Sequence, residues 1–499
     1  MSLAALVVLL PLAAAALLGL IPSMRLAAWA NFAMAALTFA AALALAWIAP
    51  APSGAWLTDG LALHMAVLTA FIGMTSAGYS VAYIGAELAA GRMERSGART
   101  YHVMFQALLG FMLLALLADN PAITWVAMEA ATIAAAIVVA LPATAAAIEA
   151  AWKYFILCGV GVALALFGTV VLYLAGQGAL GPGPAGLSWT ALTAAAPRCS
   201  AAVLNLAFVF LLIGYGTKAA LAPLHAWMPD AHAEGPTPVS AILAASIMNV
   251  ALVAILRLRG IMEANNLAHG GALPPGPPLM ALGLLSLLLA AFSLWRRRDV
   301  KRFFAFSTIE QSGVAAYAFG LGGAGATYAG LLHLTLHTIA KAAVYFPVGQ
   351  AAQMKGGQSF DRISGLLGSH RGLGLALACA ILAVAGLPPF GLFSSEFLVL
   401  TETLLRQPLL ALPLGIGLLT GAWALIARLQ TLCLGRPTPD RFPRPHPAAL
   451  VPAFLHLVVV LVLGLAMPQG VANWFADIAG AITPGTVNPA ASGPAAVSP

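Results

Sequence analysis

The chain has 499 residues, of which 61% are hydrophobic and only 8% are charged, and its mean hydropathy is +0.95. Soluble proteins carry about 25% charged residues, so this composition excludes a soluble fold and predicts a polytopic membrane protein. A helix needs about 20 apolar residues to cross about 30 Å of hydrocarbon, and a chain of this length has room for many crossings.

The cysteines and glycine-rich segments carry no cofactor signature. Cys158, Cys199, Cys379 and Cys433 show no CxxC or other metal-binding spacing. We therefore expect no disulfide framework, iron–sulfur site or haem attachment. No glycine-rich phosphate loop follows a strand, which argues against nucleotide binding. The sequence predicts no cofactor and no metal site.

Hydrophobic stretches separated by charged, proline or glycine clusters predict about fourteen membrane helices. The first stretch lacks a basic segment and a convincing cleavage site, so we expect a span rather than a signal peptide. Glycine- and proline-rich connections are expected at 176–200 and 260–276. The expected spans are 2–21, 26–49, 61–85, 101–118, 121–141, 150–175, 201–230, 237–258, 277–295, 303–322, 326–352, 373–400, 407–434 and 449–468.

Two of these helices carry proline clusters that should interrupt them. The seventh contains KAALAPLHAWMPDAHAEGPTPVSA and the twelfth contains VAGLPPFGLFSSEF. Each is the fourth helix of a five-helix set, and an odd number of helices forces the second set to run inverted. Interrupted helices at matching places in inverted repeats indicate ion sites near the membrane midplane. The expected segments are an N-terminal three-helix segment (1–100), a first five-helix repeat (101–258), an inverted second repeat (277–434), a C-terminal helix (449–480) and a disordered tail (481–499).

Basic residues in the loops predict the orientation. With the N-terminus outside, sixteen lysines and arginines fall in inner loops and four in outer loops. The positive-inside rule then favours a bacterial inner membrane with both termini in the periplasm. The RRRDVKR cluster and the net charge of +7 indicate anchoring to the lipid bilayer, with no nucleic acid as partner. The inner residues are Arg25, Arg92, Arg95, Arg99, Arg296, Arg297, Arg298, Lys301, Arg302, Lys355, Arg362, Arg371, Arg428, Arg436, Arg441 and Arg444, and the outer ones are Arg198, Arg257, Arg259 and Arg406.

A lysine and a glutamate lie at membrane depth in the first repeat. Lys218 falls within the apolar run 201–222, and Glu129 is the single charge in 123–141. An ionised carboxylate at that depth costs at least ~2.5 kcal/mol without a partner. The pair suggests a proton path in which Lys218 loads and releases a proton as neighbouring charge moves. The alternative for Glu129 is a protonated side chain bonded to a neighbouring helix.

The eleventh helix presents His333, His337 and Lys341 at a spacing of four. Successive members drift only about 40° around a helix, so all three share one face. They could form a proton relay, pack through interhelical hydrogen bonds or, for the two histidines, bind a metal ion. No carboxylate or cysteine ligand lies nearby in sequence, which favours the relay.

Two glutamates follow in the second repeat. Glu396 lies about one turn past the proline pair of the twelfth helix and could move protons or stabilise the broken helix. Glu310 lies in FSTIEQSG of the tenth helix, and we expect it nearer the inner face, as a proton carrier or as a satisfied polar contact.

Polar residues also surround the break in the seventh helix. His225, Asp230, His232 and Glu234 could take up protons at the inner side or cap helix ends.

Lys153 follows Glu149 at i+4, next to Trp152 and Tyr154. An interfacial ion pair beside an aromatic belt is the simplest account, and a second role near the proton path is the alternative.

Five segments together resemble a known family. They are AWKYFILCGVGVALALFGTVVLY, GYGTKAALAPLHAWMPDAHAEGPTPVSAIL, DVKRFFAFSTIEQSG, LLHLTLHTIAKAAVYF and GLPPFGLFSSEFLVL. Over roughly residues 60–470 the chain resembles the antiporter-like proton-translocating subunits of respiratory complex I and membrane-bound hydrogenases. WVAMEAATIAAAIVVAL followed by IEAAWKY resembles hydrogenase-4 component F in particular. The resemblance implies fourteen helices, two inverted five-helix repeats and discontinuous seventh and twelfth helices.

The resemblance also implies roles for individual residues. It maps the fifth-helix glutamate to Glu129 and the seventh-helix lysine to Lys218, and it places His337 and Lys341 in a central hydrophilic axis. Glu396 takes the exit-side position and, as a glutamate, is similar to the M-type subunit of complex I.

One position departs from the family pattern. Many complex I subunits carry lysine or histidine in the eighth helix where this chain has Asn249. Asparagine binds water but cannot carry a proton as a charge, so the connection between the halves needs His333, His337 or water.

The resemblance leaves three functions open. The first is a proton-translocating subunit without its own redox centre, assembled with other membrane and peripheral subunits of a hydrogenase or complex I-like assembly. The second is a subunit of a multi-protein sodium/proton antiporter. The third is a scaffold that conducts no ions. Fold analogy alone does not separate the first two.

Overall fold

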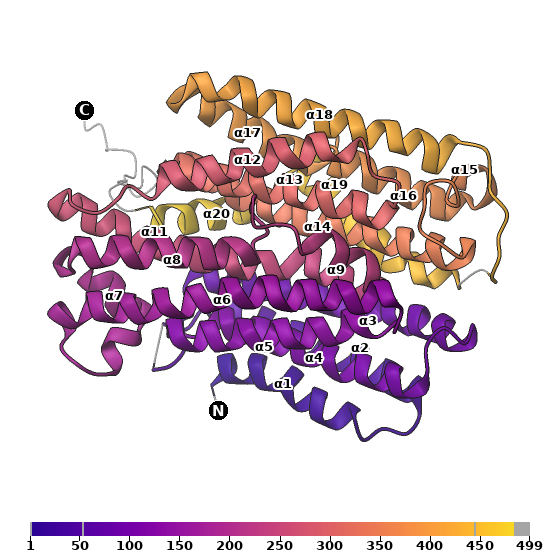
Figure 1. Cartoon of the computed structure of the whole chain (residues 1–499), viewed down its shortest axis with the longest axis horizontal. Coiled ribbons are helices and arrows are strands. Elements are labelled where there is room, and N and C mark those ends of the chain that lie inside the picture. Colours follow the sequence, from indigo (N-terminus) through magenta and orange to yellow (C-terminus); the bar gives the residue numbers. More distant parts are fainter. Residues whose placement is uncertain (1, 52–53, 444–445, 484–499) are drawn as a thin grey trace, which may run out of the picture.

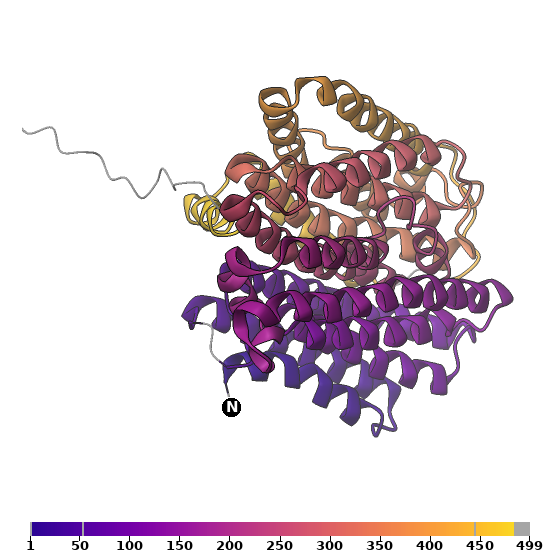
Figure 2. The same ribbon diagram turned by 60° about the vertical axis from the view of Figure 1, so that its left-hand side comes forward.

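The computed structural model describes residues 2–51, 54–443 and 446–483. In this part of the chain every regular element is a helix, and the long helices lie side by side along the longest axis of the molecule (Figure 1). The N-terminal helices form one edge and α17 and α18 form the opposite edge, in Figure 1 and in the turned view of Figure 2. The prediction of an all-helical polytopic membrane protein is confirmed.

Eleven helices among the described residues are long and apolar enough to cross a membrane, and two shorter helices, Leu3–Leu18 and Arg371–Val384, are also apolar. The count of fourteen spans and the inverted relation of the repeats stay predictions. The helices before the first break are α1 (Leu3–Leu18), α2 (Met24–Ile48), α3 (Gly60–Ala89), α4 (Arg95–Leu117), α5 (Pro121–Ala140), α6 (Ala145–Leu180), α7 (Trp189–Ala195) and α8 (Ala201–Lys218). The next are α9 (Met228–Glu234), α10 (Thr237–Ile242), α11 (Met248–His269), α12 (Gly276–Leu294), α13 (Val300–Leu321) and α14 (Gly323–Lys355). The last are α15 (Leu366–Ser369), α16 (Arg371–Val384), α17 (Gly391–Arg406), α18 (Ala411–Leu429), α19 (Val451–Leu465) and α20 (Gln469–Ala481).

Helix starts follow the local sequence. The side chains of Ser23, Asp59, Asn120 and Thr144 accept hydrogen bonds from backbone N–H groups in the first turns of α2, α3, α5 and α6. These side chains satisfy donors that the helix itself leaves free. Glycines then allow close packing, because a methyl group at Gly283 on α12 would lie 2.7 Å from the Gly313 carbonyl of α13.

Both proline-rich helices are interrupted. α8 ends at Lys218 and helix resumes at Met228, while α16 ends at Val384 and α17 begins at Gly391. The peptide bonds Ala222-Pro223 and Pro388-Pro389 are both cis.

Side chains from the neighbouring helices satisfy backbone groups freed at the first break. The Ala222 N–H donates to Ser286 Oγ of α12 at 2.8 Å, and Ser312 Oγ of α13 donates to the Ala219 carbonyl at 3.0 Å. The Trp227 indole donates to the Thr217 carbonyl at 2.8 Å. Lipid offers no such partners, so the interruption depends on these contacts.

Both expected connections differ in the structure. The eighth span was predicted to end at 258, but α11 continues to His269 because Asn265 donates to the Ala196 and Cys199 carbonyls at 2.7 and 2.9 Å. The connection 176–200 holds the end of α6 and the short helix α7, which Ser188 caps.

The C-terminal segment 449–480 contains two helices, α19 and α20, because Pro468 lies between them. The predicted disordered tail 481–499 begins inside α20, and 484–499 lie outside the described residues.

The basic loops predicted to be inner gather at one end of the molecule. The Arg92 guanidinium lies 4.6 Å from the centre of the Phe442 ring, and that of Arg428 lies 4.3 Å from the centre of the Phe360 ring. Arg428 also donates to the Arg297 carbonyl at 3.1 Å. Arg444 lies outside the described residues.

Candidate proton-translocation site

Lys218 is the last residue of α8, and no part of it is exposed. Its ammonium donates to Thr132 Oγ1 and, at 3.3 Å, to the Tyr154 hydroxyl. The nitrogen also lies 5.1 Å from the centre of the Tyr154 ring. The amine is thus held by two hydroxyls and an aromatic ring rather than by a counter-ion.

Glu129 lies near Lys218 but does not contact it. No ion pair within 4.0 Å joins the two side chains, although the carboxylate acts on the amine electrostatically. Thr132, one turn further along α5, occupies the contact with Lys218 instead. The Glu129 Oε2 atom is buried and has no hydrogen-bond partner. The expected pairing is therefore an interaction through space.

Lys218, Glu129, Thr132 and Tyr154 form a first centre, and the Lys153 side chain lies outside it. This side chain is 46% exposed and pairs with Glu149 at 2.6 Å and with Asp230 at 3.1 Å. The prediction of an aromatic belt around it is wrong for Tyr154, whose side chain turns inward to Lys218. Trp152 remains exposed.

The charged residues at the first break form a network at the end that holds the basic loops. Arg302 lies 3.2 Å from Asp230 and 3.3 Å from Glu234. Burial raises the pKa of Glu234, although Arg302 and Lys301 act to lower it. This raised pKa favours proton binding by a carboxyl group beside the break.

The two histidines of this segment take different places. His225 is partly buried, and its ring centre lies 6.3 Å from that of Phe306. His232 is fully buried, and its Nδ1 lies 3.0 Å from the Tyr345 hydroxyl of α14. His232 therefore connects the first break to the helix that carries the second lysine.

Lys341 lies in the middle of α14 with no exposed surface. Its ammonium donates to the Phe304 carbonyl of α13 at 3.2 Å. Glu310 interacts electrostatically with both Lys341 and Glu396. Glu310 was expected near the inner face, but it lies at the middle of α13 and is 1% exposed.

Lys341, Glu310 and Glu396 form a second centre. Both of its carboxylates lie against glycines. A methyl group at Gly421 of α18 would meet Glu310 Oε1 at 1.8 Å, and one at Gly386 would meet Glu396 Oε2 at 2.1 Å. Gly386 also has a φ of +63°, which favours glycine. The Gln311 amide lies beside the Glu396 carboxylate. The twelfth-helix break therefore makes room for the acid that follows it.

His333 and His337 stack in parallel, with ring centres 6.3 Å apart and planes 4° apart. His333 Nδ1 lies 3.0 Å from Ser395 Oγ, and the Nε2 atoms of both histidines are buried without a partner. No group of three or more His, Cys, Asp or Glu side chains that could hold a metal ion occurs among the described residues.

Asn249 contacts the helix that carries this histidine pair. Its side-chain amide donates at 2.8 Å to Thr338 Oγ1, directly after His337 in α14. Asn249 follows a π-helical stretch, Leu243–Ile247, a feature that occurs often at functional sites. The Ser246 hydroxyl and Asn249 Oδ1 are buried without partners. The helix that begins beside Asn249 therefore contacts α14 through a neutral amide.

Sequence reasoning missed the neutral partners of the charged groups. Thr132, Gln311 and Ser395 contact or face Lys218, Glu396 and His333 respectively. Only their positions in the sequence could have pointed to two of them, since Thr132 is three residues from Glu129 and Ser395 directly precedes Glu396. The π-helical stretch reads LAASI and carries no comparable signal.

Comparison with known proteins decides the family. The profile of the family described as NADH:quinone oxidoreductase/Mrp antiporter, TM matches residues 118–420. The chain belongs to this family. It is 44% identical over 472 residues to the hydrogenase-4 component F homolog of Methylacidiphilum infernorum, covering 95% of this chain and 98% of that protein.

The NADH:quinone oxidoreductase/Mrp antiporter family also includes more distant relatives. NADH-quinone oxidoreductase subunit N of Desulforudis audaxviator is 30% identical over 464 residues, with 85% of this chain and 84% of that protein covered.

Two solved structures share the family fold. A chain of the membrane-bound sulfane sulfur reductase, an archaeal respiratory membrane complex, matches with a TM-score of 0.84 and 22% identity over 96% of this chain and 97% of its own length. A chain of the Mrp complex from Dietzia sp. matches with a TM-score of 0.81 and 18% identity over 97% of this chain and 98% of its own length. The predicted resemblance to antiporter-like membrane subunits is confirmed.

Proposed function

We propose that this chain carries protons across a bacterial inner membrane as a subunit of a multi-subunit redox complex of hydrogenase or NADH-quinone oxidoreductase type. One observation carries the proposal. Lys218 and Lys341 are both fully buried, and each lies within electrostatic reach of a glutamate while forming no ion pair within 4.0 Å. A buried amine in that state takes up or releases a proton when nearby charge changes.

The proposed path begins at the first break, where Asp230, Glu234 and the two histidines lie near the basic loops. Protons load onto Lys218, whose affinity Glu129 modulates, and pass along α14 to Lys341. Glu310 and Glu396 release them on the far side.

Asn249 shapes the middle of this path. Because a neutral amide cannot hold the charge, water beside His333 and His337 completes the connection. The two halves, 101–258 and 277–434, act as inverted repeats, and both chain termini lie in the periplasm.

The test is proton pumping by the assembled complex in sealed vesicles, followed with a pH-sensitive dye while the redox reaction runs. Lys218→Ala is expected to abolish coupled proton movement while the complex still assembles. Arg371→Ala, at an exposed arginine that begins α16, serves as the matched control and should pump normally.

Unchanged pumping by an assembled Lys218→Ala complex would contradict the proposal and favour a non-conducting scaffold. A complex that lacks hydrogenase-, formate- and NADH-linked subunits would also count against it.

A sodium/proton antiporter subunit is the second candidate, which the match to the Mrp complex fold supports. Sodium exchange by vesicles that contain no redox partner would establish it in place of the first.

A further inference from the structure

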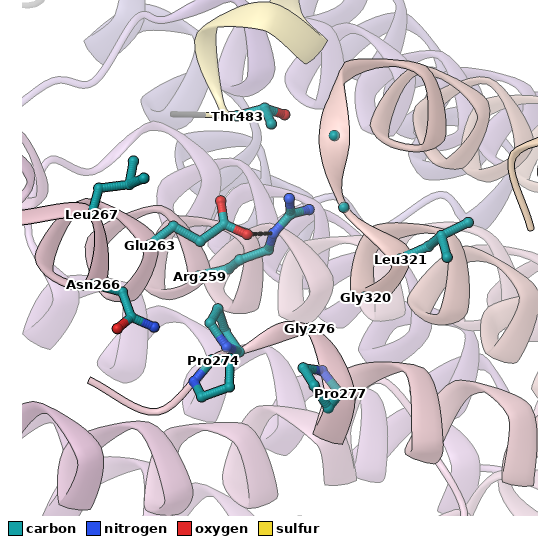
Figure 3. A pocket seen from close by; sticks show the side chains of 13 residues that line it. Arg259, Glu263, Asn266, Leu267, Pro274, Gly276, Pro277, Gly320, Leu321 and Thr483 are labelled. Carbon is teal, nitrogen blue, oxygen red and sulfur yellow. Dashed lines mark hydrogen bonds and ion pairs between the residues drawn. The ribbon is translucent and has the colours of Figure 1, made fainter. Parts of the chain in front are cut away.

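A cavity of about 540 Å³ lies where α11 ends and α12 begins, away from the buried lysines. Its walls come from three distant parts of the chain: α11 with the proline segment after it, the glycine turn between α13 and α14, and Thr483 after α20 (Figure 3). Neither proton centre contributes a residue to it.

Arg259 is the buried charge in this cavity, with 1% of the residue exposed. Its Nε donates to Glu263 at 2.6 Å and its Nη1 donates to the Phe319 carbonyl at 2.6 Å. Its Nη2 is buried and has no hydrogen-bond partner. In Figure 3 the guanidinium points toward the glycine turn, below Thr483. A buried N–H group without an acceptor is unfavourable, so Nη2 indicates an acceptor supplied from outside the chain.

The position of the cavity across the membrane indicates where that acceptor comes from. Lys301 belongs to the basic cluster that the positive-inside rule places at the inner surface, and it donates to the Gly235 carbonyl at 2.6 Å, just before α10 begins at Thr237. From Thr237 to Arg259 the helix rises about 33 Å at 1.5 Å per residue. The hydrocarbon core is about 30 Å thick. Arg259 therefore lies at the level of the outer headgroups.

The lining combines charge of both signs with apolar walls. Glu263 is 23% exposed and binds the Nε edge of Arg259, which leaves the Nη2 edge to a ligand. A ligand with two negative charges would be repelled by this carboxylate, whereas a phosphodiester carries one. A cationic group on the same ligand could bind Glu263. Leu267, Pro274 and Leu321 provide apolar surface for the rest of the molecule.

We propose that this cavity binds the headgroup of a zwitterionic phospholipid from the outer leaflet, with its phosphodiester on Arg259 Nη2 and its ammonium on Glu263. The site is independent of the proposed proton path. It gives the chain a bound lipid between α11, the turn from α13 to α14, and the end of α20.

Native mass spectrometry of the delipidated complex tests this proposal, with phosphatidylethanolamine, phosphatidylglycerol and inorganic phosphate as separate probes. The wild type should retain one phosphatidylethanolamine with about tenfold preference over phosphatidylglycerol. Arg259→Gln should lose that lipid, and Glu263→Gln should lose the preference between the two lipids.

A second variant covers the case in which Arg259→Gln fails to fold. Leu267→Trp fills the cavity from an exposed position and keeps the Arg259–Glu263 pair, so it should lose the lipid. Leu273→Trp, at an exposed leucine that does not line the cavity, is its control and should keep it.

Lipid retention by Leu267→Trp equal to that of Leu273→Trp would overturn the proposal. So would equal wild-type binding of both lipids, or Arg259-dependent retention of inorganic phosphate without any lipid, which would make the ligand a free oxyanion.

Discussion

The two buried lysines have different surroundings. Lys218 donates to the hydroxyls of Thr132 and Tyr154, and its nearest interacting carboxylate, Glu129, remains out of direct contact. Lys341 donates to a backbone carbonyl, and Glu310, which also forms no ion pair with its lysine, acts on it electrostatically and is itself acted on by Glu396.

The difference shows two ways to keep an amine at membrane depth. Rotating hydroxyls can follow the amine as its charge changes, whereas two acids depend on the packing that holds them apart. The first centre should therefore tolerate small changes in packing, and the second should be sensitive to them.

Among changes that leave both lysines in place, the largest expected effect comes from packing in the second centre. Gly421→Ala puts a methyl carbon 1.8 Å from Glu310 Oε1, so the carboxylate must move, which changes its interaction with Lys341. Proton pumping by the assembled complex should fall about tenfold, which corresponds to about 1.4 kcal/mol. The measurement is the initial pumping rate in vesicles at equal redox turnover.

Gly415→Ala on the same helix is the matched control, because a methyl group there has no heavy atom within 4 Å. If both glycine variants pump alike, the second centre does not depend on close packing and the comparison fails.

Removing a hydroxyl in the first centre should have a smaller effect. Thr132→Val keeps the shape of the side chain but takes one acceptor from Lys218, so pumping should fall about threefold, or about 0.6 kcal/mol. Thr132→Ser keeps the acceptor and should retain most of the wild-type rate.

Thr420→Val provides the control for the same change at a partly exposed threonine whose hydroxyl donates to the Ile416 carbonyl of its own helix. A Thr132→Val complex as active as this control would show that the hydroxyl does not serve the amine.

The smallest effect concerns the ion pair that joins the start of α3 to α11, outside both centres. Burial would raise the pKa of Asp59, but Arg257 at 2.8 Å and the Ala62 N–H outweigh it and lower that pKa. A carboxyl with a lowered folded pKa stabilises the protein above its unfolded value of about 3.9, and the contribution is lost as pH falls through the folded value.

Asp59→Asn should therefore cost about 0.5 kcal/mol or less at pH 7, because the side chain is 36% exposed. Thermal unfolding in detergent should show a difference from wild type at pH 7 that shrinks below about pH 4. Glu94→Gln, at an exposed N-cap without a side-chain capping bond, should show no such pH dependence.

Sequence reasoning located the groups that are anomalous in an apolar helix. Lys218, Glu129 and Lys341 are conspicuous by charge, and the two breaks are conspicuous by proline. Their neutral partners were not found, because threonine, serine and tyrosine are common in membrane helices and only the fold brings Thr132 and Tyr154 to one amine. The extension of α11 was missed for the same reason, since Asn265 stabilises it through contacts with carbonyls 66 to 69 residues away.

The break beside Lys218 is completed by the other half of the molecule. Ser286 and Ser312, which bind its freed backbone, belong to α12 and α13, outside the segment 101–258 that was predicted as the first repeat. The two halves therefore cannot rock as separate rigid bodies without exposing polar backbone to an apolar interior. Any rearrangement of the segment after Lys218 must break these hydrogen bonds or shift α12 and α13, so mechanical strain can pass between the halves even though the proposed proton path has the neutral Asn249 in its middle.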